Sequence, residues 1–301
     1  MSKAHQATRR GFILAGSAAG ALSALGSFSA LAAEQGKASA KAARAPVLFI
    51  GHGGPMNALR DNSFTRSLQA WGPSLPRPKA MLVVSAHWLT PGATAVGVQE
   101  RPETIHDFGG FPPMLHAMQY PAPGSPAFAR EAIASVKSTR VLPTTEWGLD
   151  HGTWTVLHHI YPAADIPVFQ LSIDYDKPAA YHYAIGRELA ALRDRGVMII
   201  GSGNVVHNLR ATMRGAPDSE RAGQAWAQGF DDAFARALDQ RDDKRLIDYA
   251  RMEGAATAVA TPDHYYPMLY ALGAATAGES AKTIFAGFQS GTLSMRCFQF
   301  G

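Results

Sequence analysis

The chain has 301 residues, of which 47% are hydrophobic and 17% charged, a balance typical of a globular protein that buries a sizeable core. Its formal net charge of +4 arises in the first 45 residues, because residues 46–301 hold 22 basic and 23 acidic side chains. A body so close to neutral lacks the basic surface that nucleic-acid binding requires. The single cysteine, Cys297, excludes an internal disulfide and a cysteine-rich metal site, and we expect a buried, inert thiol.

A twin-arginine pattern lies near the start of the chain, in Thr8-Arg9-Arg10-Gly11-Phe12-Ile13-Leu14. An apolar run rich in alanine and glycine follows to about Leu31, and Ala30-Leu31-Ala32 offers a cleavage site between small residues. This order predicts a twin-arginine signal peptide over residues 1–33 and a disordered linker over residues 34–45. We therefore expect a periplasmic protein with no stable membrane insertion after cleavage. The alternatives are a core helix and an uncleaved anchor, for which the run is weakly hydrophobic.

Four short apolar runs without polar alternation predict strands that are buried on both faces of a parallel sheet. They span residues 46–50, 80–84, 166–173 and 197–200. Helical patterns occur over residues 128–136, 179–193 and 221–240, and in the last of these Trp226, Phe230 and Phe234 share one side that we expect in the core. The alternation predicts one α/β domain over residues 46–301, with a mostly parallel central sheet flanked by helices.

Histidines follow three of the four predicted strands. His52 comes after the first strand, His87 after the second and His207 after the fourth. A lone histidine at a strand end is usually structural, but the carboxyl ends of parallel strands meet in one crevice, where ligands bind. Because imidazole is a ligand for Zn, Fe, Cu and Ni, the pattern predicts a metal site at these strand ends.

Further histidines lie in loops. His264 is in a loop that opens a helix, where the adjacent Asp263 would orient it or cap the helix. His151 is in a glycine-bounded polar loop, and both it and His106 are predicted to support the metal ligands or to contact a substrate. The remaining histidines of the domain fall on predicted helices and are expected to be structural or at the surface: His116, His158, His159 and His182. The sequence has no phosphate-binding loop with Gly-Lys-Ser/Thr, no Gly-x-Ser-x-Gly elbow and no His-Glu-x-x-His helix.

These histidines belong to a longer series of motifs that recurs, in the same order, in one known family. The motifs are Gly51–Met56, Val84–Trp88, Ile105–Pro112, Tyr120–Gly124, Asp150–Gly152, Gly203–Asn208 and Thr261–Tyr265. Through them, residues 46–301 resemble the 4,5-DOPA extradiol dioxygenase family, within the protocatechuate-4,5-dioxygenase-type superfamily of ring-cleaving enzymes.

The resemblance implies one divalent metal, Fe(II) or Zn(II), bound by His52 and His87, with His264 and His207 completing the site. His207 has two open roles, as a fourth ligand or as a base acting on bound substrate. Related ring-cleaving enzymes use two histidines and one carboxylate as ligands, so a carboxylate ligand also stays open. The candidates for it are Asp263 and Glu146.

The resemblance further implies that the chain opens the ring of a small aromatic diol, a DOPA-like catechol, with O2, at a bond beside the two hydroxyl groups. His207 or His151 would take a proton from the diol, and His106, Phe108 and Tyr265 would hold its ring. Two other functions fit the same histidines: a zinc-dependent hydrolase, or a non-catalytic periplasmic metal-binding protein of the same fold. The expected assembly is a monomer or a small homo-oligomer.

Overall fold

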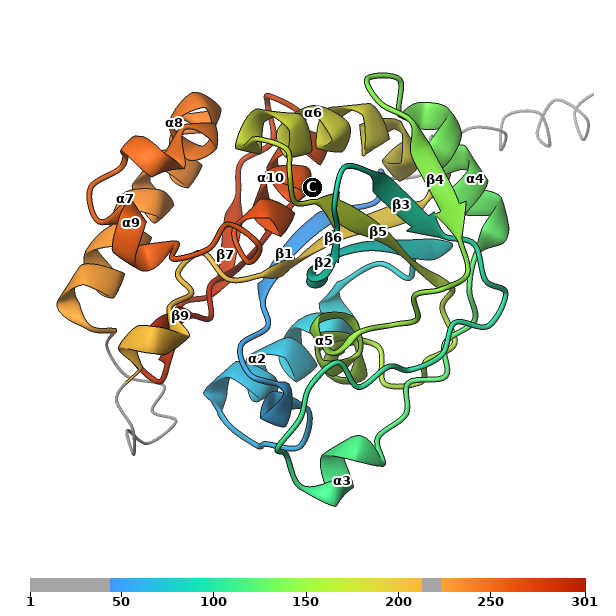
Figure 1. The fold of residues 1–301 in the computed structure, drawn as a ribbon, viewed down its shortest axis with the longest axis horizontal. Coiled ribbons are helices and arrows are strands. Elements are labelled where there is room, and N and C mark those ends of the chain that lie inside the picture. The colour runs from blue at the N-terminus through green and yellow to red at the C-terminus, as the bar shows by residue number, and fades with distance from the viewer. Residues whose placement is uncertain (1–43, 213–222) are drawn as a thin grey trace, which may run out of the picture. The chain divides into compact units, whose positions relative to one another are not determined.

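The computed structural model describes residues 44–212 and 223–301, which form an eight-stranded sheet covered by helices on both faces (Figure 1). The expected signal peptide, residues 1–33, lies outside the described residues. The expected linker also lies outside the described residues up to residue 43, but its last two residues form hydrogen bonds with the domain. The Ala45 N–H donates to the Arg193 carbonyl at 3.1 Å, and Arg44 Nη2 donates to the Ala190 carbonyl at 2.9 Å. Within the described ranges, no helix combines the length and the apolar character of a membrane span.

The strand order of the sheet is β4-β3-β5-β2-β6-β1-β10-β7. Its four central strands are mutually parallel and correspond to the four predicted strands: β1 (Val47–Gly51), β2 (Ala80–Thr90), β5 (Val168–Asp174) and β6 (Val197–Gly203). The remaining strands lie toward the edges: β3 (Thr94–Gly97), β4 (Val141–Thr144), β7 (Lys282–Phe285) and β10 (Cys297–Phe300). Of these, β3 is antiparallel to β5, and β10 is antiparallel to β1 and β7. The predicted mostly parallel sheet is therefore confirmed.

The apolar runs form strands because both faces of the central sheet are covered. Every residue of β1, β5 and β6 is buried. Successive residues of a strand point to opposite faces, so Val47 and Phe49 enter one apolar cluster while Leu48 and Ile50 enter the other. The carboxyl ends of β1, β2 and β6 thus lie side by side between two packed layers.

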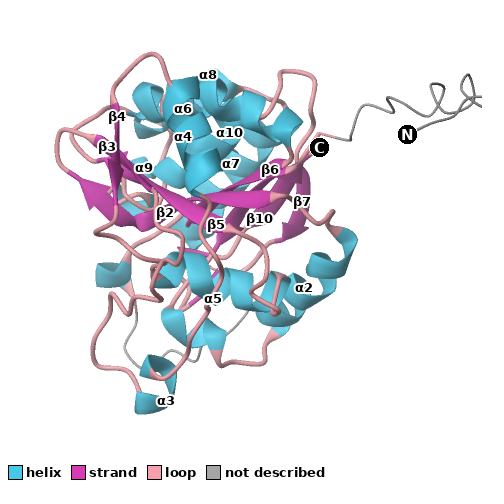
Figure 2. Ribbon diagram, turned by 90° about the vertical axis from the view of Figure 1, so that its right-hand side faces the viewer, coloured by secondary structure: helices cyan, strands magenta, loops and turns pink. Residues whose placement is uncertain are grey.

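Figure 2 shows the sheet between its two helix layers. The larger layer consists of α4 (Pro126–Ser135), α6 (Ala179–Leu189), α7 (Ala225–Asp239), α8 (Asp243–Ile247), α9 (Ala255–Ala258) and α10 (Tyr266–Ala274). The opposite layer consists of α2 (Ser63–Trp71), α3 (Pro113–His116) and α5 (His151–Ile160). Short 3-10 helices and a two-stranded sheet complete the fold: η1 (Pro55–Ala58), η2 (Gly72–Ser74), η3 (Ala190–Arg195), η4 (Leu209–Ala211), η5 (Tyr249–Arg251), β8 (Phe288–Gln289) and β9 (Leu293–Ser294).

The core expectations hold for the aromatic side of α7 and for the cysteine. Phe230 and Phe234 are buried, and Trp226 packs partly buried against the same cluster. Cys297 is a buried free thiol, and burial raises its pKa to about 12.

Three element boundaries differ from the predictions, two of them at the site. β2 does not end before His87 but continues through it, with a register shift between Val84 and Leu89. The predicted loop at His151 is wrong, because this residue begins α5, capped by the Asp150 side chain, which accepts from the Thr153 N–H at 3.1 Å. The helix predicted over residues 179–193 ends as an α-helix at Leu189 and continues as η3.

Candidate metal centre

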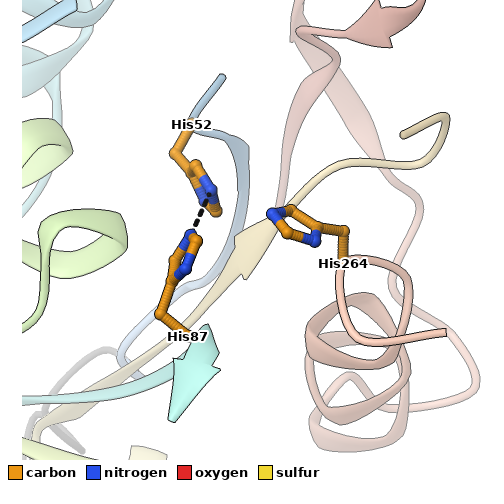
Figure 3. Close-up of side chains that lie close together, drawn as sticks. All are labelled: His52, His87 and His264. Atoms are coloured by element: carbon orange, nitrogen blue, oxygen red, sulfur yellow. Dashed lines mark hydrogen bonds between the residues drawn. The ribbon is translucent and has the colours of Figure 1, made fainter. Parts of the chain in front are cut away.

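Three histidine side chains from distant segments meet at the carboxyl end of the sheet (Figure 3). His52 directly follows β1, His87 lies in β2, and His264 lies two residues before α10. The Nε2 atoms of His52 and His87 are 3.1 Å apart. The centre of the His264 ring lies 5.3 Å from the centre of the His52 ring and 5.2 Å from the centre of the His87 ring. One ring nitrogen from each residue lies within 4.8 Å of the other two.

The end of β6 holds two of these histidines in place. The His52 N–H donates to the Gly203 carbonyl at 3.1 Å, and the His264 carbonyl accepts from the Asn204 N–H at 2.8 Å. A Cβ on Gly203 would lie 2.2 Å from the His264 carbonyl oxygen, so only glycine lets the two backbones approach this closely. Gly203 and Asn204 therefore fix the positions of His52 and His264 at the end of β6.

The Nδ1 atoms of His52 and His264 both have hydrogen-bond partners outside the three-histidine group. His52 Nδ1 lies 3.0 Å from Ser202 Oγ, whose own proton goes to the Gly152 carbonyl at 2.5 Å. Ser202 must therefore accept from His52, which fixes the proton on Nδ1 and leaves a lone pair on Nε2. His264 Nδ1 is hydrogen-bonded to the Asp263 carboxylate, with the same consequence for its Nε2. Such partners orient metal-binding imidazoles.

The Asp107 carboxylate lies close to both His151 and His87. Its Oδ1 accepts from the His151 N–H at 2.9 Å, and its Oδ2 accepts from His151 Nδ1 at 2.9 Å and lies 3.5 Å from His87 Nδ1. Burial alone would raise the pKa of Asp107, but the hydrogen bonds and charge of His151 lower it below its ordinary value. Asp107 is not among the residues predicted for the site, although it is the one acid of the Ile105–Pro112 motif.

The donor set fits a divalent metal ion. The Nε2 atoms of His52 and His87, 3.1 Å apart, are close enough to bind one ion at the bond length of about 2.0–2.1 Å that imidazole nitrogens have with Zn(II). Burial lowers the pKa values of His52 and His87 well below the ordinary value of histidine, and the neighbouring histidines lower them further. Both imidazoles are therefore neutral and can offer a nitrogen lone pair to a metal ion. Three imidazoles also leave coordination positions open, as in catalytic sites.

His207 and His151 flank this trio instead of joining it. The His207 ring stacks on that of His264, with centres 3.5 Å apart and planes 4° from parallel, and its nitrogens group with Asp263 and His264 instead of His52 and His87. Burial, and then the neighbouring His264, lower the pKa of His207 to about 3. The His151 ring lies 3.8 Å from that of His87. The structure thus places His207 against His264 and outside the group formed by His52, His87 and His264.

All five histidines line one pocket of about 280 Å³, near the lower end of the range for small-molecule sites. The rest of its lining is apolar or glycine: Gly53, Gly54, Pro55, Phe108, Phe111, Leu209 and Leu293. Phe108 was predicted to contact substrate, and it packs edge-on against His151 with ring centres 5.5 Å apart.

Two predicted substrate residues do not reach the pocket. Tyr265 is fully buried on the core side, where its hydroxyl donates to the Leu246 carbonyl at 2.9 Å. His106 lies behind Phe108, and its Nε2 is 3.0 Å from the Met118 carbonyl.

The two candidate carboxylate ligands differ in their distance from the histidine cluster. Glu146 is exposed at the surface, outside the pocket lining. Asp263 is hydrogen-bonded to Nδ1 of His264, as a residue that orients this imidazole would be, and its carboxylate also lies close to nitrogens of both His207 and His264.

Comparison with known proteins gives consistent matches over the described domain. Residues 43–296 match the family described as the catalytic LigB subunit of aromatic ring-opening dioxygenase. A 4,5-DOPA dioxygenase extradiol of Escherichia coli (strain K12) is 49% identical over 86% of this chain and 95% of its own length. A 4,5-DOPA dioxygenase extradiol of Beta vulgaris is 36% identical over 84% of this chain and 96% of its own length. A crystal structure of an uncharacterized Escherichia coli K12 protein superposes with a TM-score of 0.74 at 44% identity, covering 86% of this chain and 100% of that one.

Proposed function

The chain belongs to the family of the catalytic LigB subunit of aromatic ring-opening dioxygenases, and from this premise we propose that it opens a catechol ring with O2 at one divalent metal ion. The bond that breaks lies beside the two hydroxyl-bearing carbons, and both atoms of O2 enter a muconic-semialdehyde product. Family membership favours this reaction over a zinc hydrolase or a non-catalytic metal-binding protein.

One observation carries the proposal: the convergence of three oriented imidazoles in a pocket with an apolar wall. His52, His87 and His264 would hold the metal through Nε2, since the Nδ1 atoms face Ser202, Asp107 and Asp263. When bound, the metal supplies Lewis acidity that lowers the pKa of the diol hydroxyls and, as Fe(II), the redox chemistry that O2 requires and that Zn(II) lacks.

His151 has the geometry of a proton acceptor. The Asp107 carboxylate can only accept, so a His151 ring that carries one proton holds it on Nδ1 and has a lone pair on Nε2. The carboxylate also stabilises the imidazolium that forms when Nε2 takes a proton from a diol hydroxyl. His207 borders the same pocket as a second neutral imidazole, and Phe108 lines the pocket beside His151.

The test is reconstitution of the purified protein with Fe(II) under anaerobic conditions, followed by addition of a catechol and air. We expect a yellow ring-opened product and consumption of one O2 for each ring opened, while protein loaded with Zn(II) forms none. Failure to cleave any catechol at full Fe(II) occupancy would overturn the proposed function.

We further propose that residues 1–33 direct export by the twin-arginine route to the periplasm. The twin arginines and the apolar run support this, as does the start of the family match at residue 43. Replacing Arg9 and Arg10 together by lysine should retain the unprocessed protein in the cytoplasm. Periplasmic delivery of that variant would contradict the proposal. The monomer or small homo-oligomer stays a prediction.

A further inference from the structure

We propose that Asp150 is a positioning residue that sets the spacing between the proposed metal ligand His87 and the proton acceptor His151. This inference rests on the proposed function and deepens it. Asp150 is fully buried and lies outside the pocket lining, so it acts on the metal and the substrate only through the residues that it holds.

Asp150 links the two segments that carry these histidines. Its Oδ1 accepts from Ser85 Oγ at 2.7 Å, and Ser85 Oγ in turn accepts from the His87 N–H at 3.3 Å. The same Oδ1 accepts from the Thr153 N–H at 3.1 Å and thereby caps α5, the helix that begins with His151. One oxygen atom thus ties β2 to α5, and the ring centres of His87 and His151 lie 3.8 Å apart.

This link lies where the pairing of β2 with β5 is interrupted. β2 pairs with β5 up to Val84 and again from Leu89, and His87 lies in the interval between them. Beside this interval, Gln170 of β5 binds Asp150 at two points. Its Nε2 donates to Asp150 Oδ2 at 2.6 Å, and its Oε1 accepts from the Asp150 N–H at 3.0 Å. The Asp150 carboxylate therefore connects β5 to β2 where the strand ladder does not.

The contact between α5 and the histidines leaves little room for movement. A Cβ on Gly152 would lie 3.0 Å from His87 Cδ2, so the backbone of the first turn of α5 packs directly against the His87 ring. The Gly152 carbonyl also accepts from Ser202 Oγ, which is the partner of His52. A shift of this turn would therefore displace His151 and disturb two of the proposed ligands. A misplacement of about 1 Å can lower a rate about a hundredfold.

The surroundings of Asp150 fit a carboxylate and not an amide. Ser85 Oγ and the Thr153 N–H donate to Oδ1. Gln170 Nε2 and Trp147 Nε1 donate to Oδ2, the latter at 3.2 Å. In either orientation, the amide of Asp150→Asn would turn its NH2 toward at least one N–H donor. Because a buried donor without an acceptor is unfavourable, we expect the side chain and the first turn of α5 to shift.

The experiment compares Asp150→Asn with the double variant Asp150→Asn/Gln170→Glu, which moves the carboxylate to the neighbouring side chain. In the double variant, the amide NH2 of residue 150 can donate to the new carboxylate, which also accepts from the backbone N–H of residue 150. We expect Asp150→Asn to bind Zn(II) about tenfold to a hundredfold more weakly in a competition titration, and its Fe(II) form to lose about a hundredfold in kcat with a catechol. The double variant should recover most of both losses.

Two outcomes of this comparison would overturn the inference. One is wild-type Zn(II) affinity and kcat in folded Asp150→Asn. The other is a double variant that regains the thermal stability of the wild type but neither its metal affinity nor its kcat, because Asp150 would then support the fold without positioning the site. Asp242→Asn is a matched control, since Asp242 caps α8 by accepting from the Arg245 N–H at 3.1 Å, and it should change neither quantity.

A readout that does not depend on turnover separates this inference from failure of the proposed function. The visible absorption bands of bound Co(II) depend on the arrangement of its ligands. Asp150→Asn should shift these bands, and the double variant should restore them, whether or not the Fe(II) form opens a ring. An unchanged Co(II) spectrum in Asp150→Asn would overturn the positioning of His87.

Ser85→Ala tests the link to β2 while the cap of α5 stays in place. It removes the hydroxyl that joins Asp150 to the His87 segment and should weaken Zn(II) binding by about tenfold. Wild-type Zn(II) affinity in this variant would show that His87 is held without Asp150 and would overturn the inference.

Discussion

Replacing Asp107 by asparagine should separate turnover from metal binding. The substitution keeps the shape of the side chain but changes what it offers to His151. The backbone N–H of His151 can only donate, so it keeps the amide oxygen at the position of Oδ1. The amide NH2 then faces His151 Nδ1, which must accept, and the ring proton moves to Nε2. The pocket side of His151 thereby changes from a proton acceptor to a donor.

The two expected losses differ in size. Removing a positioned general base typically costs about a hundredfold to ten-thousandfold in rate, and we expect kcat of the Asp107→Asn variant to fall by this much. Metal affinity should fall by only about tenfold, or about 1.4 kcal/mol, the low end for loss of an outer partner. The smaller effect is expected because Asp107 Oδ2 lies 3.5 Å from His87 Nδ1, longer than a normal hydrogen bond.

The assay pairs kcat of the Fe(II)-loaded variant with a Zn(II) competition titration against a chromophoric chelator. Asp165→Asn is a matched control, since Asp165 is an exposed aspartate paired with Arg77 at 2.9 Å, and it should change neither quantity. Wild-type turnover in Asp107→Asn, or parallel losses of turnover and metal affinity, would refute the assignment of Asp107 to the His151 tautomer.

Two further predictions concern the site, and a third concerns a buried histidine of the core. Ser202→Ala removes the acceptor for His52 Nδ1 and should weaken Zn(II) binding by about tenfold to a hundredfold, whereas unchanged affinity in the titration would show that Ser202 does not orient the ligand. His207→Ala should retain one bound metal per chain by elemental analysis, because the His207 ring lies outside the three-histidine group; loss of the metal would make it a ligand. Burial lowers the pKa of His182 in the folded protein to about 4. As the pH falls below 6.5, His182 is therefore protonated in the unfolded chain before it is protonated in the folded protein, and the free energy of unfolding decreases. In denaturant unfolding of metal-free protein, the stability advantage of wild type over His182→Gln should therefore shrink by about 3 kcal/mol between about pH 6.5 and pH 4, and a constant difference would contradict this.

The sequence predicted the centre of the fold better than its edges. The central strands β1, β2, β5 and β6 are buried on both faces, so their apolar runs are visible without an alternating pattern. The edge strand β7 has no buried residue and only four residues, so it has no such pattern. The extension of β2 through His87 depends on an irregular register with β5, which is a property of the pairing and not of either segment alone.

The site shows the same division between local and tertiary information. His52 and His264 were found because a strand end or a motif marks them, and convergence of strand ends is a rule of the fold class. The stacking of His207 on His264 was not predictable, since ring orientation depends on contacts between segments. Asp107 was not predicted for a related reason: it contacts His151 where α5 begins, and the sequence pattern there predicted a loop.

The wide separation of the three proposed ligands along the chain would link metal binding to folding. His52, His87 and His264 approach one another only when β1, β2 and the segment before α10 are packed, so the unfolded chain has no preformed site. A metal that binds only the folded state stabilises it by about 2.7 kcal/mol when its free concentration is a hundred times its Kd. The twin-arginine route that we propose carries folded proteins, so a chain exported by it would present a formed site to the metal pool of the cytoplasm. The resident metal would then be set before export, by the relative availability of Fe(II) and Zn(II) where the chain folds.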